Sequence, residues 1–113
     1  MPNSLRGPLA LKDHVIDEEI SQESPGAYVL EESRDLVSFH VAYVGRSDRD
    51  INNQLHVHVG SYKRFQYEYC SSAEEAFQKE CNLYHDLEPR DNPVHPRRQP
   101  GTAWKCPRCK LLG

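Results

Sequence analysis

The fold of this chain is decided by two short runs, Gly26-Ala27-Tyr28-Val29-Leu30 and Val41-Ala42-Tyr43-Val44-Gly45. Both consist mainly of residues that favour β-strands. The residues between them, Glu31-Glu32-Ser33-Arg34-Asp35, are too polar to be buried and numerous enough to reverse the chain. The sequence therefore predicts an antiparallel hairpin. Side chains alternate between the faces of a strand, so a suitable register brings Tyr28 and Tyr43 to one face.

A glycine accompanies each tyrosine and leaves room for a ligand or another backbone to approach. The plainer interpretation is that both tyrosines pack a half-buried sheet.

The residues after the hairpin predict a helix, a third strand and a second helix. A polar segment from Asp48 to Val59 has apolar residues at helical spacing, with Ser47 or Asp48 as the N-cap. Aromatic and polar residues alternate from Phe65 to Tyr69, which is the pattern of a half-buried strand. A capping box at residues 71–75 begins the second helix, and Glu88-Pro89 ends it. In the segment before Ser24, Pro2, Gly7 and Pro8 suggest an irregular start, and a short apolar stripe that suits either a strand or a helix consists of Leu9, Leu11, Val15, Ile16 and Ile20.

The two tyrosine motifs, Gly26-Ala27-Tyr28 and Tyr43-Val44-Gly45-Arg46-Ser47, resemble the paired signature of the GIY-YIG nuclease superfamily. The resemblance covers about residues 25–87. It implies a compact α/β (α+β) module with a small three-stranded antiparallel sheet flanked by helices. We therefore expect an N-terminal extension (residues 1–24), a GIY-YIG-like domain (residues 25–89) and an irregular C-terminal tail (residues 90–113) packed on the same domain.

The resemblance also implies roles for several residues. Glu80 would bind a catalytic Mg²⁺ or Mn²⁺ ion, which neutralises charge on the phosphodiester during hydrolysis. Tyr28 and Tyr43 would position or deprotonate the attacking water, although tyrosine is a poor base at neutral pH unless a cation lowers its pKa. Arg46 matches a basic residue near the phosphate, and His58 matches a histidine of the family. Otherwise Glu80 is an ordinary helical glutamate and Arg46 a solvated cation.

One position departs from the family pattern. The family's first helix carries an arginine just before a leucine, a few residues ahead of a histidine. Leu55 and His58 fit this frame, but Gln54 holds the arginine position, with Asn53 before it. Glutamine cannot neutralise charge in a transition state, and the loss of such a cation usually costs orders of magnitude in rate. Arg49 is a possible substitute; otherwise the protein binds nucleic acid without cutting it.

A second group of residues predicts a metal site independently of the resemblance. Cys81 and His85 lie four residues apart on the predicted helix and point the same way, and Cys106-Pro107-Arg108-Cys109 has the spacing of a zinc knuckle. Together they predict a tetrahedral Cys₃His structural zinc site that attaches the tail to the helix. His95 and Cys70 are alternative ligands. Without zinc, Cys70 and Cys81 are core thiols and the terminal pair is free or redox-active.

The composition limits the class of protein. The chain has 113 residues, of which 37% are hydrophobic and 27% charged, which suits one domain with a modest core. No apolar run approaches the roughly 20 residues of a membrane helix, and no secretory signal is visible, so we expect a cytoplasmic protein without a membrane partner. The net charge of −3 argues against a protein that coats nucleic acid. The tail nevertheless carries a basic run.

The sequence favours a metal-dependent endonuclease acting on nucleic acid, with DNA as the expected substrate. The expected phosphate contacts are Arg46, Arg49, Arg97 and Arg98. One alternative is a non-catalytic nucleic-acid-binding module, which Gln54 favours. The other is a structural or partner-binding protein with a zinc knuckle, which the negative charge favours. Asn92 loosely matches an asparagine that some family members have after the glutamate helix.

Overall fold

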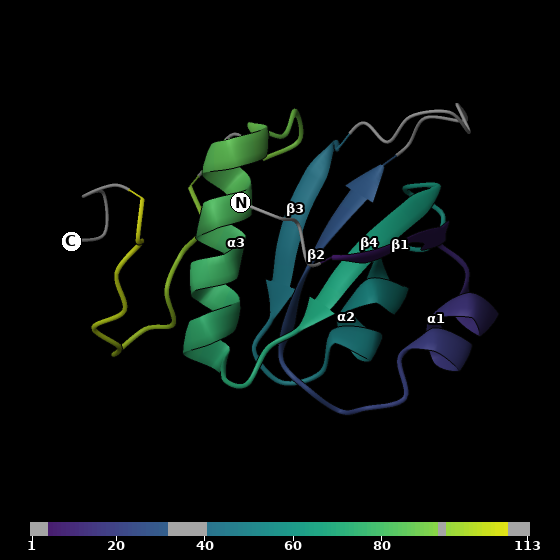
Figure 1. The fold of residues 1–113 in the computed structure, drawn as a ribbon, viewed down its shortest axis with the longest axis horizontal. Helices are drawn as coiled ribbons and strands as arrows, with labels where there is room; N and C mark the ends of the chain where they lie inside the picture. The colour runs from purple at the N-terminus through teal and green to yellow at the C-terminus, as the bar shows by residue number, and fades with distance from the viewer. Residues whose placement is uncertain (1–4, 32–40, 93–94, 109–113) are drawn as a thin grey trace.

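The computed structural model describes residues 5–31, 41–92 and 95–108. The elements within these ranges are β1 (Arg6–Ala10), α1 (Asp13–Glu19), β2 (Gly26–Glu31), β3 (Tyr43–Ser47), α2 (Ile51–Val57), β4 (Arg64–Tyr69) and α3 (Ala73–Leu87). The described chain forms a small α+β fold with one four-stranded antiparallel sheet of order β1-β4-β2-β3. Helix α3 covers one face of the sheet, and α1 and α2 lie on the other (Figure 1).

The predicted hairpin is confirmed by the antiparallel pairing of β2 with β3. Tyr28 stands opposite Gly45, and Leu30 stands opposite Tyr43. Residues 28 and 30 point to the same face of β2, so this register places Tyr28 and Tyr43 on one face of the sheet. Their ring centroids are 6.4 Å apart. The predicted turn residues after Glu31 lie outside the described residues.

The prediction of three strands is wrong, because Arg6–Ala10 adds a fourth. This strand, β1, pairs with β4 at the edge of the sheet. Its register shifts between Arg6 and Leu9, a stretch that contains Gly7 and Pro8. Proline is tolerated at an edge strand or a bulge because its missing N–H then removes no ladder hydrogen bond. Gly7 and Pro8 are the residues that suggested an irregular start in the sequence, and they lie within this strand.

Strand β2 is buried on both faces and separates two apolar layers. Tyr28 and Leu30 face the layer beneath α1 and α2, while Ala27 and Val29 face α3. The first layer also contains Leu11, Ile16, Ile20, Ile51, Leu55, Phe65 and Tyr67. The second layer also contains Val44 and Leu83. Leu11, Ile16 and Ile20 therefore join the segment before β2 to the same core.

The helix starts agree only partly with prediction. The capping box of α3 is present, since Glu75 N–H donates to Ser72 Oγ at 3.1 Å and Ser71 N–H donates to Glu75 Oε1 at 2.7 Å. For α2 the predicted N-cap is wrong. Asp50 caps this helix by accepting from Asn52 N–H at 3.1 Å, and Ser47 instead accepts from Asp50 N–H in the preceding turn. None of the helices in the described ranges is long and apolar enough to cross a membrane.

Glu31 contradicts the expectation that the polar residues after β2 are exposed. Its side chain is completely buried, and Arg64 on the neighbouring strand β4 donates to both carboxylate oxygens, at 2.6 Å and 2.8 Å. A buried carboxylate is tolerated when a cation pairs with it and hydrogen bonds satisfy its oxygens. The fork of the guanidinium provides both.

We expect Arg64→Met to lower the free energy of unfolding by about 3–5 kcal/mol, because it removes the guanidinium that donates to both oxygens of the buried Glu31 carboxylate. The double variant Glu31→Leu/Arg64→Met should recover most of this loss, since it removes both charges together. Chemical denaturation measures both values.

The matched control is Arg90→Met, which breaks a more exposed ion pair with Asp91 and should cost less than about 1 kcal/mol. An equal cost for Arg64→Met and Arg90→Met would contradict the role assigned to the buried pair.

Candidate active site

The two tyrosine motifs meet at Gly45 on the edge strand β3. A Cβ atom at Gly45 would lie 2.5 Å from both Cζ and Oη of Tyr28. Only a residue without a side chain therefore lets the Tyr28 ring lie over β3. At Gly26 a Cβ atom would lie 2.5 Å from the carbonyl oxygen of Glu68 and 2.7 Å from Cδ1 of Ile51. The two glycines do allow a close approach, as the sequence predicted. The approaching group is the Tyr28 ring at Gly45, and at Gly26 it is the backbone of Glu68 and the side chain of Ile51.

Four aromatic side chains, Tyr28, Tyr43, His58 and Tyr62, form the aromatic cluster on this side of β3. The Tyr28 hydroxyl lies 2.9 Å from Nε2 of His58. The His58 ring centroid is 5.1 Å from that of Tyr43 and 6.1 Å from that of Tyr62. The sequence predicted His58 here, directly after α2, but missed Tyr62. Its place in the turn before β4 gave no periodic signal.

Burial sets the protonation states in the aromatic cluster. It raises the pKa of Tyr28 well above the ordinary value, and the neighbouring Tyr43 raises it further. Burial also raises the pKa of Tyr43. The same desolvation lowers the pKa of His58. At neutral pH both tyrosines are therefore uncharged phenols and His58 is an uncharged imidazole. Of the three, only the imidazole is ready to accept a proton.

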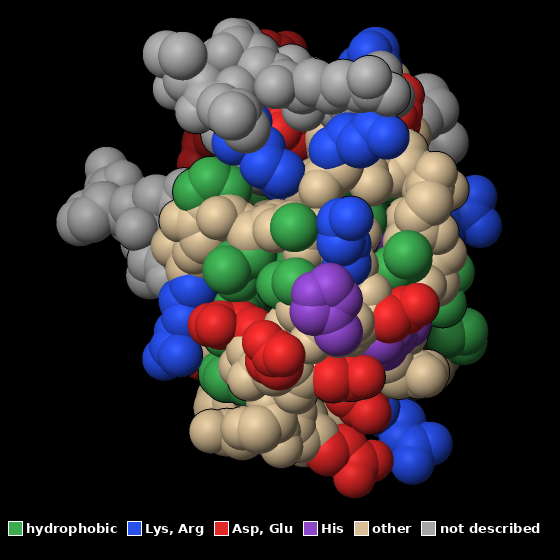
Figure 2. Space-filling model, turned by 90° about the vertical axis from the view of Figure 1, so that its right-hand side faces the viewer, with side chains coloured by type: hydrophobic (Ala, Val, Ile, Leu, Met, Phe, Trp, Pro, Cys, Tyr) green, Lys and Arg blue, Asp and Glu red, His purple; other side chains and the backbone are tan. Residues whose placement is uncertain are grey.

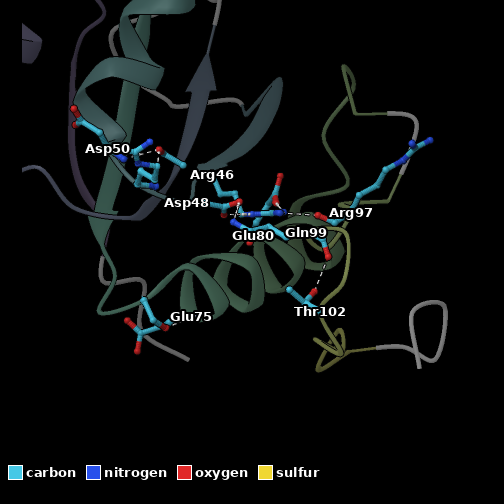
Figure 3. Close-up of polar contacts among 11 residues, drawn as sticks. Arg46, Asp48, Asp50, Glu75, Glu80, Arg97, Gln99 and Thr102 are labelled. Carbon is cyan, nitrogen blue, oxygen red and sulfur yellow. Dashed lines mark hydrogen bonds and ion pairs between the residues drawn. The ribbon is translucent and has the colours of Figure 1, made fainter.

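Arg46 directly follows Gly45 and points to the opposite face of β3, toward α3 (Figure 3). Its guanidinium donates to Glu80 Oε1 at 2.6 Å, to Asp48 Oδ1 at 2.7 Å and to the carbonyl oxygen of Arg97 at 2.7 Å. It also lies 5.1 Å from the ring centre of Phe77. Each of its three guanidinium nitrogens therefore already donates a hydrogen bond within the protein, whereas the sequence predicted a contact with phosphate.

Glu80 is the buried carboxylate that the sequence placed on the inner face of the second helix. Its residue exposure is 8%. Burial raises its pKa, while the Arg46 cation acts in the opposite direction. The negative charge of Glu80 raises the pKa of both Tyr28 and Tyr43. The carboxylate and the aromatic cluster thus interact electrostatically across the edge strand, although they lie on its two sides.

A hollow of about 460 Å³ lies where β3 leads into α2. It is lined by Glu23, Ser47, Asp48, Arg49, Asp50, Asn53 and Gln54. Gln54, at the position where the resemblance predicts an arginine, and the predicted substitute Arg49 therefore line the same hollow. The side chain of Gln54 also lowers the pKa of Tyr28, against the larger effect of burial.

Asn92 lies at the exposed edge of β3. Its Oδ1 accepts from Val44 N–H at 2.7 Å, and its Nδ2 donates to the Val44 carbonyl at 3.0 Å. The next residue back, Asp91, donates its N–H to the Ala42 carbonyl at 2.8 Å. The side chain of Asn92 thus satisfies backbone groups that an edge strand otherwise leaves unpaired.

The structure brings Cys81, His95 and Cys106 together, and we call these three residues the metal group. Their ligand atoms all lie within 4.8 Å of one another, close enough to hold a metal ion. Burial, followed by the neighbouring Cys106, raises the pKa of the Cys81 thiol. Zinc binds thiolates, so metal binding would release protons here.

The metal group contains two of the predicted ligands, Cys81 and Cys106, together with His95, which the sequence offered as an alternative ligand. His85 stays adjacent, with its Nε2 3.2 Å from Nε2 of His95. Cys70 is buried but is not a member of the metal group. The predicted ligand Cys109 lies outside the described residues.

Comparisons with protein-family models, curated proteins and solved structures find no significant match for this chain. Its function is therefore inferred from the side chains and distances given above.

We expect His58 to titrate below the ordinary histidine pKa of 6.5, because burial disfavours its charged form. His56 provides the matched control within the same helix. Its ring nitrogens lie 2.6 Å from Asp13 Oδ1 and 2.9 Å from Asp17 Oδ1, and these hydrogen bonds raise its pKa above 6.5. An NMR titration of the imidazole signals measures both. A His58 signal that titrates together with or above His56 would contradict the assigned burial of the site.

Proposed function

We propose that this protein is a GIY-YIG-like, metal-dependent endonuclease that hydrolyses phosphodiester bonds of nucleic acid, with DNA as its substrate. The observation that carries the proposal is the 2.9 Å contact between Tyr28 and an uncharged His58, with the carboxylate of Glu80 across the same strand. Hydrolysis needs a base for the attacking water and a positive charge near the phosphate oxygens. The neutral imidazole of His58 would be the base, and a metal ion bound by Glu80 would provide the positive charge.

His58 is the proposed general base, and Tyr28 is the proposed relay. When Nε2 of His58 carries no proton, the Tyr28 hydroxyl donates to it. The phenol oxygen can then take a proton from water while its own proton passes to His58. This relay removes the difficulty that tyrosine is a poor base, because Tyr28 never carries a full negative charge. Its raised pKa is compatible with this role.

Glu80 is the proposed ligand of the catalytic Mg²⁺ or Mn²⁺ ion. Arg46 engages Oε1 of Glu80, so Oε2 is the oxygen that would bind the ion. Mg²⁺ is usually held by one or two carboxylates together with waters and substrate phosphates, so a single glutamate suffices. Glu80 and Asp48 share one guanidinium, which leaves the three side chains with a net charge of −1 that favours a cation. The bound ion would neutralise charge on the phosphodiester.

We also propose that the metal group binds zinc in a structural role. Two cysteines and a histidine are ligands that zinc prefers over the oxygen ligands of magnesium. Two nitrogen ligands about 2.1 Å from a tetrahedral ion lie roughly 3.4 Å apart. The 3.2 Å between Nε2 of His85 and Nε2 of His95 is close to this value, so we propose His85 as the fourth ligand, although it is not one of the three residues whose ligand atoms all lie within 4.8 Å of one another.

The alternative function is a non-catalytic nucleic-acid-binding module. It is favoured by Gln54 at the position of the family's arginine and by Arg46, each of whose three guanidinium nitrogens donates a hydrogen bond within the protein. Nucleic acid would not approach the face that carries α1, where acidic side chains and histidines gather (Figure 2). This acidic face also suits the third possibility, a structural protein that binds a basic partner.

We expect Mg²⁺- or Mn²⁺-dependent cleavage of DNA that Glu80→Gln lowers by on the order of 10²-fold or more, because a charge-stabilising group is lost. His58→Ala should lower the rate by about 10²–10⁴-fold. The wild-type rate should fall as the pH drops through the pKa of His58, since the imidazole then becomes protonated.

Labelled substrates of several shapes, incubated with either ion and with EDTA, measure these rates. Glu74→Gln changes an exposed glutamate of the same helix and is the matched control. Circular dichroism checks that each variant is folded. Undiminished cleavage by folded Glu80→Gln would remove that residue from the active site, and no cleavage by the wild type would favour the binding module.

For either nucleic-acid function, we expect charge reversal in Arg97→Glu/Arg98→Glu to weaken DNA binding and flatten its salt dependence. Each lost phosphate contact should change the slope of log affinity against log salt by about 0.9. Both side chains are exposed, and Arg97 contacts Arg46 only through its backbone carbonyl. Lys12→Glu on the α1 side is the control. An unchanged slope in the double variant would exclude these two residues from DNA binding.

A further inference from the structure

Residues 95–106, which we call the strap, run beside α3 next to the Arg46–Glu80 ion pair (Figure 3). Half of the residues of the strap are exposed, and only Pro96 and Cys106 are buried. Its apolar attachment is small: Trp104 packs on Phe77 with ring centroids 5.7 Å apart, beside Cys106. A segment that buries so little apolar surface needs another attachment to keep one position.

The middle of the strap contacts the candidate active site. The carbonyl oxygen of Arg97 accepts from Nη2 of Arg46 at 2.7 Å, and Nε2 of Gln99 donates to Oδ2 of Asp48 at 2.7 Å. Thr102 closes the turn by donating its hydroxyl to the Gln99 carbonyl at 2.7 Å. The side chain of Arg97 extends away from Arg46 (Figure 3). The strap thus provides a hydrogen-bond acceptor for the Arg46 guanidinium and a hydrogen-bond donor for the carboxylate of Asp48.

The two ends of the strap are metal-group residues. His95 is its first residue and Cys106 its last, and both meet Cys81 on α3. Nδ1 of His95 lies 2.8 Å from the Pro96 carbonyl oxygen, so Nδ1 carries the proton that is donated there and Nε2 carries the lone pair. Such a bond to a backbone carbonyl is usual for a histidine that binds a metal, because it fixes the tautomer and the ring orientation. Cys81 directly follows Glu80 in the helix.

We propose that zinc bound by Cys81, His95 and Cys106 closes the strap and thereby positions the Arg46 guanidinium beside Glu80. A metal that joins both ends of the strap to one point on α3 removes most of the conformational freedom of the segment between them. Arg97 and Gln99 are then held against Arg46 and Asp48. Arg46 is a positioning residue in this proposal, which rests on the zinc assignment above and not on nuclease activity.

The first measurement is the zinc content of the full chain by elemental analysis. We expect about one zinc per chain in the wild type, and loss of zinc in His95→Ala and in Cys106→Ser. Cys70→Ala removes a buried cysteine outside the metal group and should retain the zinc. A wild type purified without zinc that also fails to take up added Zn²⁺ would overturn the metal site.

The second measurement compares the zinc-loaded and chelated protein by limited tryptic digestion. The strap contains trypsin sites after Arg97, Arg98 and Lys105, whose side chains are exposed. We expect chelator treatment or His95→Ala to accelerate cleavage at these sites, while cleavage after the exposed Lys12 stays constant. Equal rates at the strap sites with and without zinc would overturn the closure of the strap.

The third measurement follows the solvent exchange of the Arg46 Nε proton by NMR, which reports on the ion pair without any substrate. Removing zinc should accelerate this exchange by on the order of tenfold, since hydrogen bonds to charged groups are lost around the guanidinium. Gln99→Ala should keep the zinc and accelerate the exchange in part, because only the contact with Asp48 is removed. If zinc binds but neither chelation nor Gln99→Ala changes the exchange, the coupling is wrong even though the metal site is correct. Because none of these measurements depends on cleavage, an inactive protein does not affect their outcome.

Discussion

The placement of the Tyr28 ring over Gly45 is the constraint on which the candidate site depends. Strand β2 is buried on both faces, so the Tyr28 side chain begins in the layer beneath α1 and α2. Its ring reaches the His58 imidazole only because no Cβ atom stands at position 45. Any larger residue there would force the ring to move, and the hydrogen bond to His58 would be lost with it. The same glycine is thus required by the core and by the proposed chemistry.

The step from Gly45 to Arg46 divides the site between two faces. Successive side chains of a strand point in opposite directions, so Arg46 must leave the face on which Tyr28 lies and turn toward α3. There it meets Glu80, which could not remain a buried carboxylate without a cation. The aromatic cluster and the Arg46–Glu80 ion pair lie on the two faces of β3, which is an edge strand of the sheet. Asn92 occupies the backbone N–H and carbonyl of Val44, which opposes pairing of another strand with this edge.

The parts of the structure that could be predicted from the sequence are those specified by nearby residues. The hairpin, the alternating strand β4 and the capping box of α3 each follow from neighbours within a few positions. The parts that were missed depend on partners far along the chain. The burial of Glu31 requires Arg64, which is 33 residues away, and β1 is a strand only because β4 offers it an edge. Helical spacing correctly placed Cys81 and His85 on α3, but it could not indicate that the chain returns His95 to the helix.

Two adjacent residues of α3, Glu80 and Cys81, belong to the two different metal sites that we propose. Neighbouring side chains on a helix point about 100° apart, so Glu80 turns toward Arg46 while Cys81 turns toward Cys106. The carboxylate oxygen suits a hard ion that keeps its waters and can meet a phosphate, whereas the thiolates and imidazole suit zinc in a closed site. Each donor set disfavours the other ion, so the two proposed sites can lie side by side without exchanging metals. Helix α3 carries both Glu80 and Cys81, so one rigid element fixes the position of the proposed catalytic ion relative to the proposed zinc site and the strap.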